Sequence, residues 1–529
     1  MSKPTQIILI FALINIALFS WFSSFIAEDA YIVYRYSENL AHGNGLVFNQ
    51  GEYVSALTSP LHSLIVSALY RVTGESAWTN RIFALVLHFA ATLYALNTIR
   101  LERGLILFGL TVWISPYATL WTAGGLETMY LSSFLIVAFA AGRRCMDEES
   151  TKYQTLFSVC LGLAFLTRFD SCLVTLPMWL HVATRQWKVT NHGKLQSILK
   201  LLLPGLFIAI VWLSTSYWYY HDIFPTSVYH KPARWDDQTT NLRYMIQFGL
   251  LTGLIPLIGW SVSNHVKHPG SSIVGAATNT FTRHWGVLLG GLIFFGYATG
   301  TATAHMMFSY RMLLPYLPIL TLIIINLIDS IHSDGLTAGR FGKAGWTLVS
   351  ILAILFQSTQ FYYIDQHSVN PGRYGEYTNL SRQTYIRFME LLADQAGAIN
   401  EHWASQDIVR PPQVHVYAAG IVPYRLDQSR VVDWGLISYR KNVSEAQRGL
   451  LYSSDYILTL TPRHSTKKDQ LQRDPGTLEL VHERELAGFD HADDRLETFS
   501  VYYNPSPIEY VLPDYVDGPE LTPIPKEIQ

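Results

Sequence analysis

Residues Ile7–Tyr36 read IILIFALINIALFSWFSSFIAEDAYIVYRY: a long apolar run, then two adjacent carboxylates, Glu28 and Asp29. About twenty mostly apolar residues suffice to cross the hydrocarbon of a bilayer as a helix. Acidic side chains are costly where a helix leaves the hydrocarbon, so an acidic pair there indicates a use. A cleavable signal peptide is the alternative, but a cut after Ala27 would place bulky Phe25 where a small residue is needed. The stretch therefore predicts a retained membrane helix with an acidic pair at its outer end.

The composition divides the chain into an apolar two thirds and a water-soluble third. Of 529 residues 49% are hydrophobic and 15% are charged, with a formal net charge of −2, which excludes a disordered or nucleic-acid-binding protein. Residues 364–529 hold 40 of the 78 Asp, Glu, Lys and Arg residues, about 24% of that segment, against about 10% before it. We therefore predict a membrane domain over 1–363, a soluble α/β domain over 364–504 and a proline-rich, extended tail over 505–529.

Apolar runs separated by charged or turn-rich breaks predict about eleven transmembrane helices, two of them short. They are Ile7–Ile26, Arg81–Ile99, Gly104–Trp121, Leu126–Gly142, Thr155–Thr167, Cys172–Thr184, Ile198–Tyr219, Tyr244–Ser261, Trp285–Thr303, Tyr310–Asp329 and Trp346–Tyr363. The chain is thus expected to be a multi-pass α-helical membrane protein with a C-terminal soluble domain.

One further apolar run, Thr58–Tyr70, decides the orientation of everything after it. If this run does not cross the membrane, 14 of the 22 Lys and Arg residues of the membrane part face the cytoplasm; if it crosses, the bias reverses. We therefore predict one long outer loop over residues 27–79, a cytoplasmic amino terminus and an extracytoplasmic soluble domain. In a Gram-negative bacterium this domain would be periplasmic and the membrane would be the inner, cytoplasmic one.

In this orientation the polar clusters of the membrane part fall on the same outer face. They are Glu28, Asp29, Tyr31, Arg35, Tyr36 and Asn44 in the first loop, then Glu127, the pair Arg168 and Asp170, the run Tyr229-His230-Lys231, and Arg311. Each has a structural alternative: Glu127 can cap a helix, Arg168 can pair with Asp170, and Arg311 can extend to the interface. Together, acids and cations beside a membrane surface describe a site for a phosphorylated lipid, with a carboxylate suited to act as a general base on an alcohol.

These motifs resemble those of the GT-C membrane glycosyltransferases, and in particular the terminal arabinofuranosyltransferase family of mycobacterial cell-wall assembly. The first outer loop carries the most specific part: Glu28-Asp29-Ala-Tyr-Ile, Arg35-Tyr36, Gly43-Asn44-Gly45-Leu-Val-Phe-Asn49 and Thr58-Ser59-Pro60-Leu61. Later motifs are similar as well: Gly125-Leu126-Glu127-Thr128, Arg168-Phe-Asp170, Pro225-Thr226-Ser-Val-Tyr229 and Tyr310-Arg311-Met-Leu-Leu-Pro315. The resemblance covers most of the chain.

The resemblance implies a GT-C fold and a glycosyltransferase that moves a sugar, arabinofuranose, from a polyprenyl-phosphate donor to a cell-surface glycan. It implies that Asp29 is the catalytic base, with Glu28 beside it. The implied cations for the donor phosphate are Arg35, His230, Lys231 and Arg311, and the implied substrate contacts are Tyr31, Tyr36, Asn44, Glu127, Arg168, Asp170, Tyr229 and Trp434. No metal or other cofactor is required by this chemistry, because the donor phosphate is a good leaving group. The expected partners are the lipid donor, the glycan acceptor and the bilayer, with no nucleic acid.

The soluble third reads as a small mixed domain. A helix is predicted over Thr378–Trp403 by its apolar spacing, and short strands are predicted over Gln413–Ala418, Val431–Asp433, Asp455–Leu460, Thr477–His482 and Thr498–Tyr503. Its aromatic residues Tyr417, Tyr424 and Trp434 either stack on an acceptor sugar or belong to the core.

Two other functions compete with glycosyl transfer from a lipid-linked donor. A transporter or flippase of a lipid-linked glycan should carry polar groups near the bilayer midplane, often in repeated halves, whereas the ionisable residues here gather at one face. A surface-glycan ligase or polymerase shares the setting and the donor class, and the sequence separates it poorly from a transferase of single sugars.

Overall fold

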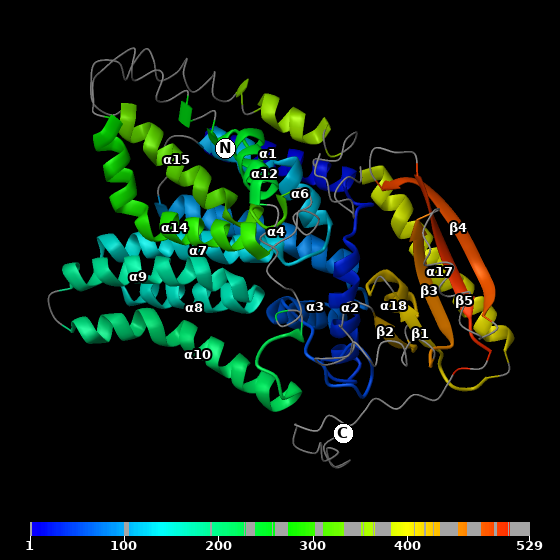
Figure 1. Cartoon of the computed structure of the whole chain (residues 1–529). Helices are drawn as coiled ribbons and strands as arrows, with labels where there is room; N and C mark the ends of the chain where they lie inside the picture. Colours follow the sequence, from blue (N-terminus) through cyan, green and yellow to red (C-terminus); the bar gives the residue numbers. More distant parts are fainter. Residues whose placement is uncertain are drawn as a thin grey trace.

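A computed structural model shows how the chain is arranged (Figure 1). The structure describes residues 3–99, 105–190, 193–226, 228, 238–255, 258–259, 273–301, 310–332, 351–352, 354–362, 364, 382–406, 408–416, 419–426, 428–433, 453–462, 478–490, 495–505 and 507. The apolar part of the chain forms a bundle of helices, and the soluble part forms a sheet with two helices beside it.

The bundle is built from helices of 4 to 29 residues, most of them apolar. In chain order they are α1 (Lys3–Trp21), α2 (Glu28–Ala41), α3 (Pro60–Thr73), α4 (Ala77–Ile99), α5 (Leu105–Phe108), α6 (Pro116–Ala123), α7 (Thr128–Asp147), α8 (Thr151–Thr167), α9 (Cys172–Val189), α10 (Lys194–Tyr220), α12 (Gln238–Leu251), α14 (Ile273–Thr301) and α15 (Leu317–His332). Among the described residues, α1, α4 and α10 are each long and apolar enough to cross a membrane. The expected class, a helical membrane protein, is confirmed, and the number of eleven spans stays a prediction.

The predicted span Gly104–Trp121 is not one straight helix. α5 continues into a π-helical turn over Gly109–Trp113, and α6 follows at an angle of 46°. Pro116 stands at the first position of α6, where its missing N–H and fixed φ favour a new helix start over continuation.

The predicted span Tyr310–Asp329 also starts differently. Regular α-helix begins only at Leu317, after a 3-10 turn over Leu314–Tyr316 that contains Pro315. Tyr310 has a left-handed φ of 61°. Arg311 therefore lies in irregular chain and not inside a membrane helix.

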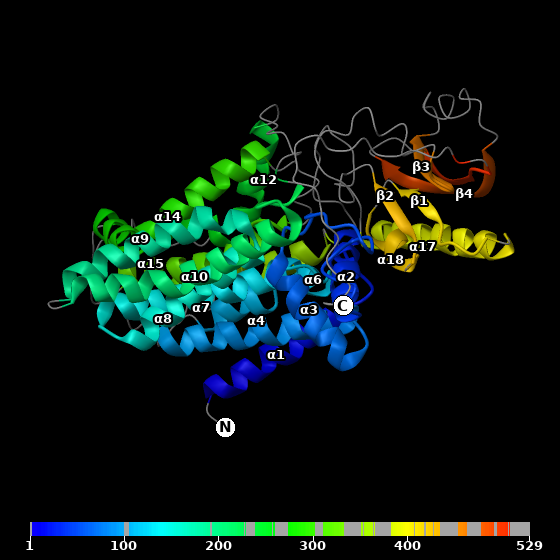
Figure 2. The same cartoon turned by 90° about the horizontal axis from the view of Figure 1, so that it is seen from below.

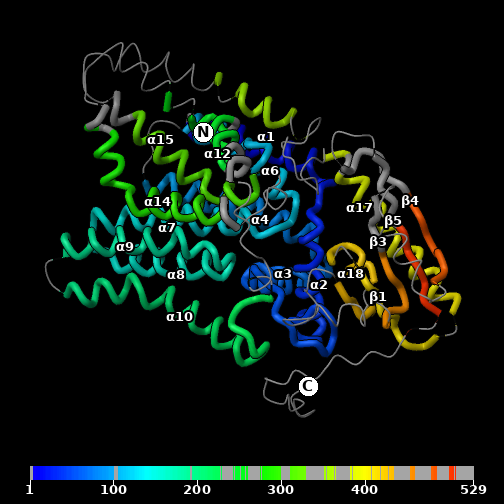
Figure 3. Tube along the Cα trace, in the orientation of Figure 1, coloured from blue at the N-terminus to red at the C-terminus, as the bar shows by residue number. Residues whose placement is uncertain are grey.

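α2 and α3 lie together at one end of the bundle (Figure 2). α2 runs crosswise to α7, α8 and α9, over their ends (Figure 3). α3 contains most of the run Thr58–Tyr70, and the predicted orientation depends on whether that run crosses the membrane. The helix begins with Pro60 and is capped by Gly74, which has a left-handed φ of 72°. With 14 residues, α3 is too short to span a bilayer. This favours the single outer loop over residues 27–79.

The soluble part contains the helix and all five strands that the sequence predicts. Helix α17 (Arg382–Ser405) precedes β1 (Gln413–Val416), α18 (Ile421–Arg425), β2 (Arg430–Asp433), β3 (Tyr456–Pro462), β4 (Glu479–Asp490) and β5 (Arg495–Tyr503). The strand order is β2-β1-β3-β5-β4; β1 is parallel to both neighbours, and β5 is antiparallel to β3 and β4. The domain boundaries at 363 and 504 stay predictions.

The sheet and the first outer loop share one hydrophobic core. Tyr36 and Phe48 of the loop are buried with Val414 and Val431 of the sheet. The Asn49 side chain pairs with the edge strand β2: its Nδ2 donates to the Val431 carbonyl at 2.8 Å, and its Oδ1 accepts from the Val431 N–H at 3.0 Å. The soluble part is therefore packed against the same end of the bundle that carries the acidic pair.

Candidate active site

Five charged side chains form a continuous chain of ion pairs at this end of the bundle. Arg311 bonds Asp29 at 3.2 Å and Glu127 at 3.2 Å. Arg168 forms an ion pair with Glu127 at 2.8 Å and donates two hydrogen bonds to Asp170, at 3.0 and 2.6 Å. The order is thus Asp29, Arg311, Glu127, Arg168, Asp170. All five are among the residues that the sequence predicts for the site, and they come from four separate connections of the chain.

Local backbone structure brings these side chains to one place. Asp29 stands in the first turn of α2, where a carboxylate interacts favourably with the helix dipole. Glu127 ends the turn between α6 and α7, which passes through Gly125 with a left-handed φ of 77°. Arg168 adopts an extended conformation directly after α8. α7 starts and α8 ends at the same end of the bundle, so Glu127 and Arg168 lie close together there.

Glu127 is the buried centre of the chain of ion pairs. Its side chain is only 3% exposed. Burial alone would raise the pKa of Glu127, but Arg311 and Arg168 outweigh it and lower that pKa to about 2. Glu127 occupies the cap position of α7 without a side-chain capping bond, so the capping alternative does not account for it. Arg168 pairs with Asp170, as its alternative had it, and with Glu127 as well.

The two adjacent carboxylates face different surroundings. Asp29 is 59% exposed and turns toward Arg311. Glu28 turns toward the soluble part, where its Oε1 accepts a hydrogen bond from the Gly420 N–H, and its own N–H donates to the Tyr385 hydroxyl at 2.6 Å. Burial, with the nearby Asp29 charge, raises the pKa of Glu28 to about 8. Of the two carboxylates, therefore, Asp29 is the one exposed to a substrate.

Aromatic side chains from both parts of the chain lie beside the acidic pair. The ring of Tyr31 is 5.1 Å from that of Tyr424 and 5.7 Å from that of Tyr34. Tyr424 also donates to Glu38 at 2.9 Å. Tyr31 is half-buried, whereas Tyr34 is fully buried. Tyr31 and Tyr424 thus offer aromatic surface next to Asp29.

Arg35 lies in a structural position, away from the ion pairs. Its side chain is buried and donates to the backbone carbonyls of Phe48 at 2.8 Å, Ser429 at 2.7 Å and Leu426 at 3.3 Å, and also to that of Pro423. The predicted phosphate contact of Arg35 therefore finds no support: its donors fasten the first loop to the soluble part.

Tyr36 and Asn44 have comparable roles within the fold. Tyr36 is fully buried and donates to the Val54 carbonyl at 3.0 Å, and the Asn44 amide bonds the Asn39 side chain at 3.3 Å. The other predicted site residues, Tyr229, His230, Lys231 and Trp434, lie outside the described residues, as does Tyr417.

Asn80, whose side chain holds the turn that leads to Glu127, was not identified from the sequence. Its side chain donates to the Gly125 carbonyl at 2.8 Å and to Tyr34 at 3.2 Å, accepts from Tyr130 at 2.8 Å and lies 3.0 Å from His62 Nε2. The partners come from four separate segments, so no local pattern announces them. A signal was present all the same, since an asparagine at the end of a membrane helix needs buried partners.

No protein-family model matches the chain. A terminal β-(1→2)-arabinofuranosyltransferase of Mycobacterium tuberculosis (strain ATCC 25618 / H37Rv) is 28% identical over 262 residues, and the match spans 45% of this chain and 40% of that protein. Two crystal structures of ArnT from Cupriavidus metallidurans, one in the apo state and one bound to undecaprenyl phosphate, align with TM-scores of 0.53 at 10% identity, over 94% of this chain and 98% of theirs.

The chain shares the ArnT fold. An alignment over nearly both whole chains includes the helical bundle and the soluble part together. These two comparisons confirm the expected resemblance to GT-C membrane glycosyltransferases, near the terminal arabinofuranosyltransferases. The chain spans 40% of the length of this curated relative.

Proposed function

We propose that the protein is a glycosyltransferase that moves one sugar from a polyprenyl-phosphate donor to a glycan acceptor at the outer face of the cytoplasmic membrane. The observation that carries the proposal is the exposed Asp29 carboxylate, paired with Arg311 and braced by the buried Glu127. The shared fold with a protein that binds undecaprenyl phosphate supports the class of donor.

Asp29 acts as the general base. It takes the proton of an acceptor hydroxyl as the oxygen attacks the anomeric carbon, and the bond from that carbon to the phosphate oxygen breaks, leaving its electron pair on the phosphate. Glu28 is unsuited to this task, because it is held by Gly420 and keeps its proton up to about pH 8. It fastens the site to the soluble part.

Arg311 is the cation that receives the phosphate charge. Its Nε is buried and has no partner among the described residues, so the two carboxylates do not use all the donors of the guanidinium. Its bonds to Asp29 and Glu127, at 3.2 Å, are longer than the 2.6 Å bond of Arg168 to Asp170. Arg168 is committed between two carboxylates and positions Glu127. No metal is needed, because the phosphate leaves readily and Arg311 compensates its charge.

The sugar is arabinofuranose in this proposal, on the strength of the likeness to an arabinofuranosyltransferase. The acceptor glycan packs on the joined aromatic surface of Tyr31 and Tyr424, and His230, Lys231 and Trp434 are further proposed contacts. The orientation, with the soluble part outside, follows from the excess of Lys and Arg on the opposite side.

The test is transfer from synthetic polyprenyl-phosphate arabinofuranose to a simple acceptor glycan by detergent-purified protein. Asp29→Asn should lower kcat by about 10² to 10⁴ while donor binding persists. Arg311→Gln should raise the donor KM as well. Glu28→Gln is the matched control: it removes the neighbouring carboxyl group but keeps an acceptor for the Gly420 N–H, so it should retain most of the activity.

Two results would decide against the proposal. Full activity of folded Asp29→Asn would remove Asp29 as the base. Tight binding of polyprenyl-phosphate sugars without transfer to any acceptor would favour the transporter.

A further inference from the structure

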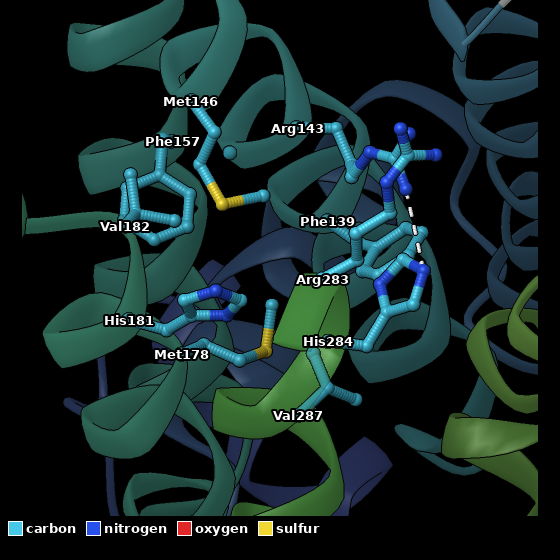
Figure 4. A pocket seen from close by; sticks show the side chains of 11 residues that line it. Phe139, Arg143, Met146, Phe157, Met178, His181, Val182, Arg283, His284 and Val287 are labelled. Carbon is cyan, nitrogen blue, oxygen red and sulfur yellow. Dashed lines mark hydrogen bonds between the residues drawn. The ribbon is translucent and has the colours of Figure 1, made fainter. Parts of the chain in front are cut away.

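A second cluster of cations lies within the bundle, away from the ion pairs at Asp29. α7 starts beside Glu127 and reaches Arg143 after sixteen residues, about 24 Å of helix. There α7, α8, α9 and α14 surround a small cavity lined by Arg143, Arg283, His181 and His284 among apolar side chains (Figure 4). Arg185 lies beside it and donates to the Thr282 carbonyl at 2.9 Å.

The cavity presents hydrogen-bond donors that lack acceptors. Arg143 Nη1 lies 3.3 Å from His284 Nε2 (Figure 4). Because arginine can only donate, His284 Nε2 accepts and its proton sits on Nδ1, which is buried and without a partner among the described residues. His181 Nδ1 lies 3.4 Å from the Gly286 nitrogen, and the ring also interacts with the Thr282 backbone, so His181 is not counted as a free donor.

No acid balances these donors where the structure describes the chain. Neither Arg143 nor Arg283 forms an ion pair with a carboxylate among the described residues. Asp147, at the end of α7, attracts Arg143 electrostatically but is exposed to solvent. His181 and His284 are at most 3% exposed. Two arginines, with the buried Nδ1–H of His284, match an anion with several oxygens.

The surroundings select a lipid over a free ion. Leu180, Trp187 and Phe281, on the helices that form the cavity, are large, apolar and exposed. The wall itself contains Phe139 and Met178. We propose that this cavity binds the phosphate headgroup of an anionic phospholipid, in the leaflet opposite to Asp29. Basic pockets between membrane helices on the cytoplasmic side suit such headgroups.

The test is lipid retention by the purified full-length protein, measured by native mass spectrometry after delipidation and addition of dioleoyl phosphatidylglycerol or dioleoyl phosphatidylcholine. Wild type should prefer phosphatidylglycerol, and Arg143→Gln/Arg283→Gln should bind it about 25-fold more weakly, from roughly fivefold per arginine. Arg283→Gln alone, at an exposed position, should lose about fivefold and serves if the double variant misfolds.

The matched control is Lys152→Gln/Lys188→Gln, which removes two exposed cations from helix ends outside the cavity lining. It should leave phosphatidylglycerol binding unchanged; an equal loss would mean diffuse attraction and overturn the site. Millimolar inorganic phosphate should not displace the lipid. Displacement would show a site for a free anion and overturn the lipid assignment. None of these readouts depends on glycosyl transfer.

Discussion

Glu127 and Glu28 show how surroundings separate carboxylates within one site. Two arginines lower the pKa of Glu127 to about 2, so its contribution to stability is present above pH 4.5 and is lost as the pH falls from there toward 2. Burial raises the pKa of Glu28 to about 8. Asp29, exposed between them, is left as the carboxylate that a substrate can reach. Surroundings that give neighbouring carboxyl groups very different pKa values commonly mark sites where those groups have different catalytic roles.

Glu28 makes the stability of the protein depend on pH in the neutral range. A carboxyl whose pKa is higher in the folded protein contributes stability that is complete below its ordinary value of 4.5 and lost as the pH rises through about 8. We expect the melting temperature to fall between about pH 5 and pH 9. Glu28→Gln, which stays neutral, should flatten this decline. Superimposable profiles of the two proteins, measured by thermal unfolding in detergent, would refute the assignment.

At the scale of elements, the turn between α6 and α7 sets the position of Glu127. Gly125 adopts a φ of 77°, and a Cβ there would collide with the Tyr34 hydroxyl. Gly125→Ala should therefore strain the turn by about 1–2 kcal/mol and displace Glu127, lowering kcat by on the order of 10². The measurement is the transfer assay beside a melting curve.

Gly291→Ala in α14 is the control for this substitution. No atom lies within 4 Å of a Cβ at Gly291, and alanine favours a helix by about 1 kcal/mol, so activity and folding should persist. Equal activity of the two variants would show that the turn does not hold Glu127 in place.

The sequence predicted the charged residues of the candidate site better than it predicted the residues and helix starts that position them. Asp29, Glu127, Arg168, Asp170 and Arg311 are found from sequence because charges beside a bilayer are conspicuous. The same criterion misplaced Arg35, since a buried arginine that bonds carbonyls and one that holds phosphate look alike in a sequence. The helix starts at Pro116 and Leu317 show the same limit: apolar runs show which residues avoid water, whereas prolines within them set where helix begins.

At the scale of the whole molecule, α2 joins the bundle to the soluble part. Arg382 of α17 donates to the Trp21 carbonyl at 3.1 Å, Tyr385 accepts from Glu28, and the Asn49 side chain pairs with the edge strand β2. The acidic pair thus stands where three parts of the chain meet. The soluble part is in a position to bring an acceptor to Asp29, because Tyr424 and Gly420 contact the same helix.

Arg35 is the residue through which this assembly can be separated from catalysis. Arg35→Met removes the donors of at least four buried carbonyls, at a cost of about 1–3 kcal/mol for each group left without a partner. The soluble part should then open more often, and trypsin should cleave it at least about tenfold faster. Arg430→Met is the control: its pair with Glu52, at 2.6 Å, lies at the surface and contributes little. A raised donor KM in Arg35→Met, with unchanged cleavage, would instead restore Arg35 to the phosphate site, because a residue that holds phosphate acts on donor binding without loosening the soluble part.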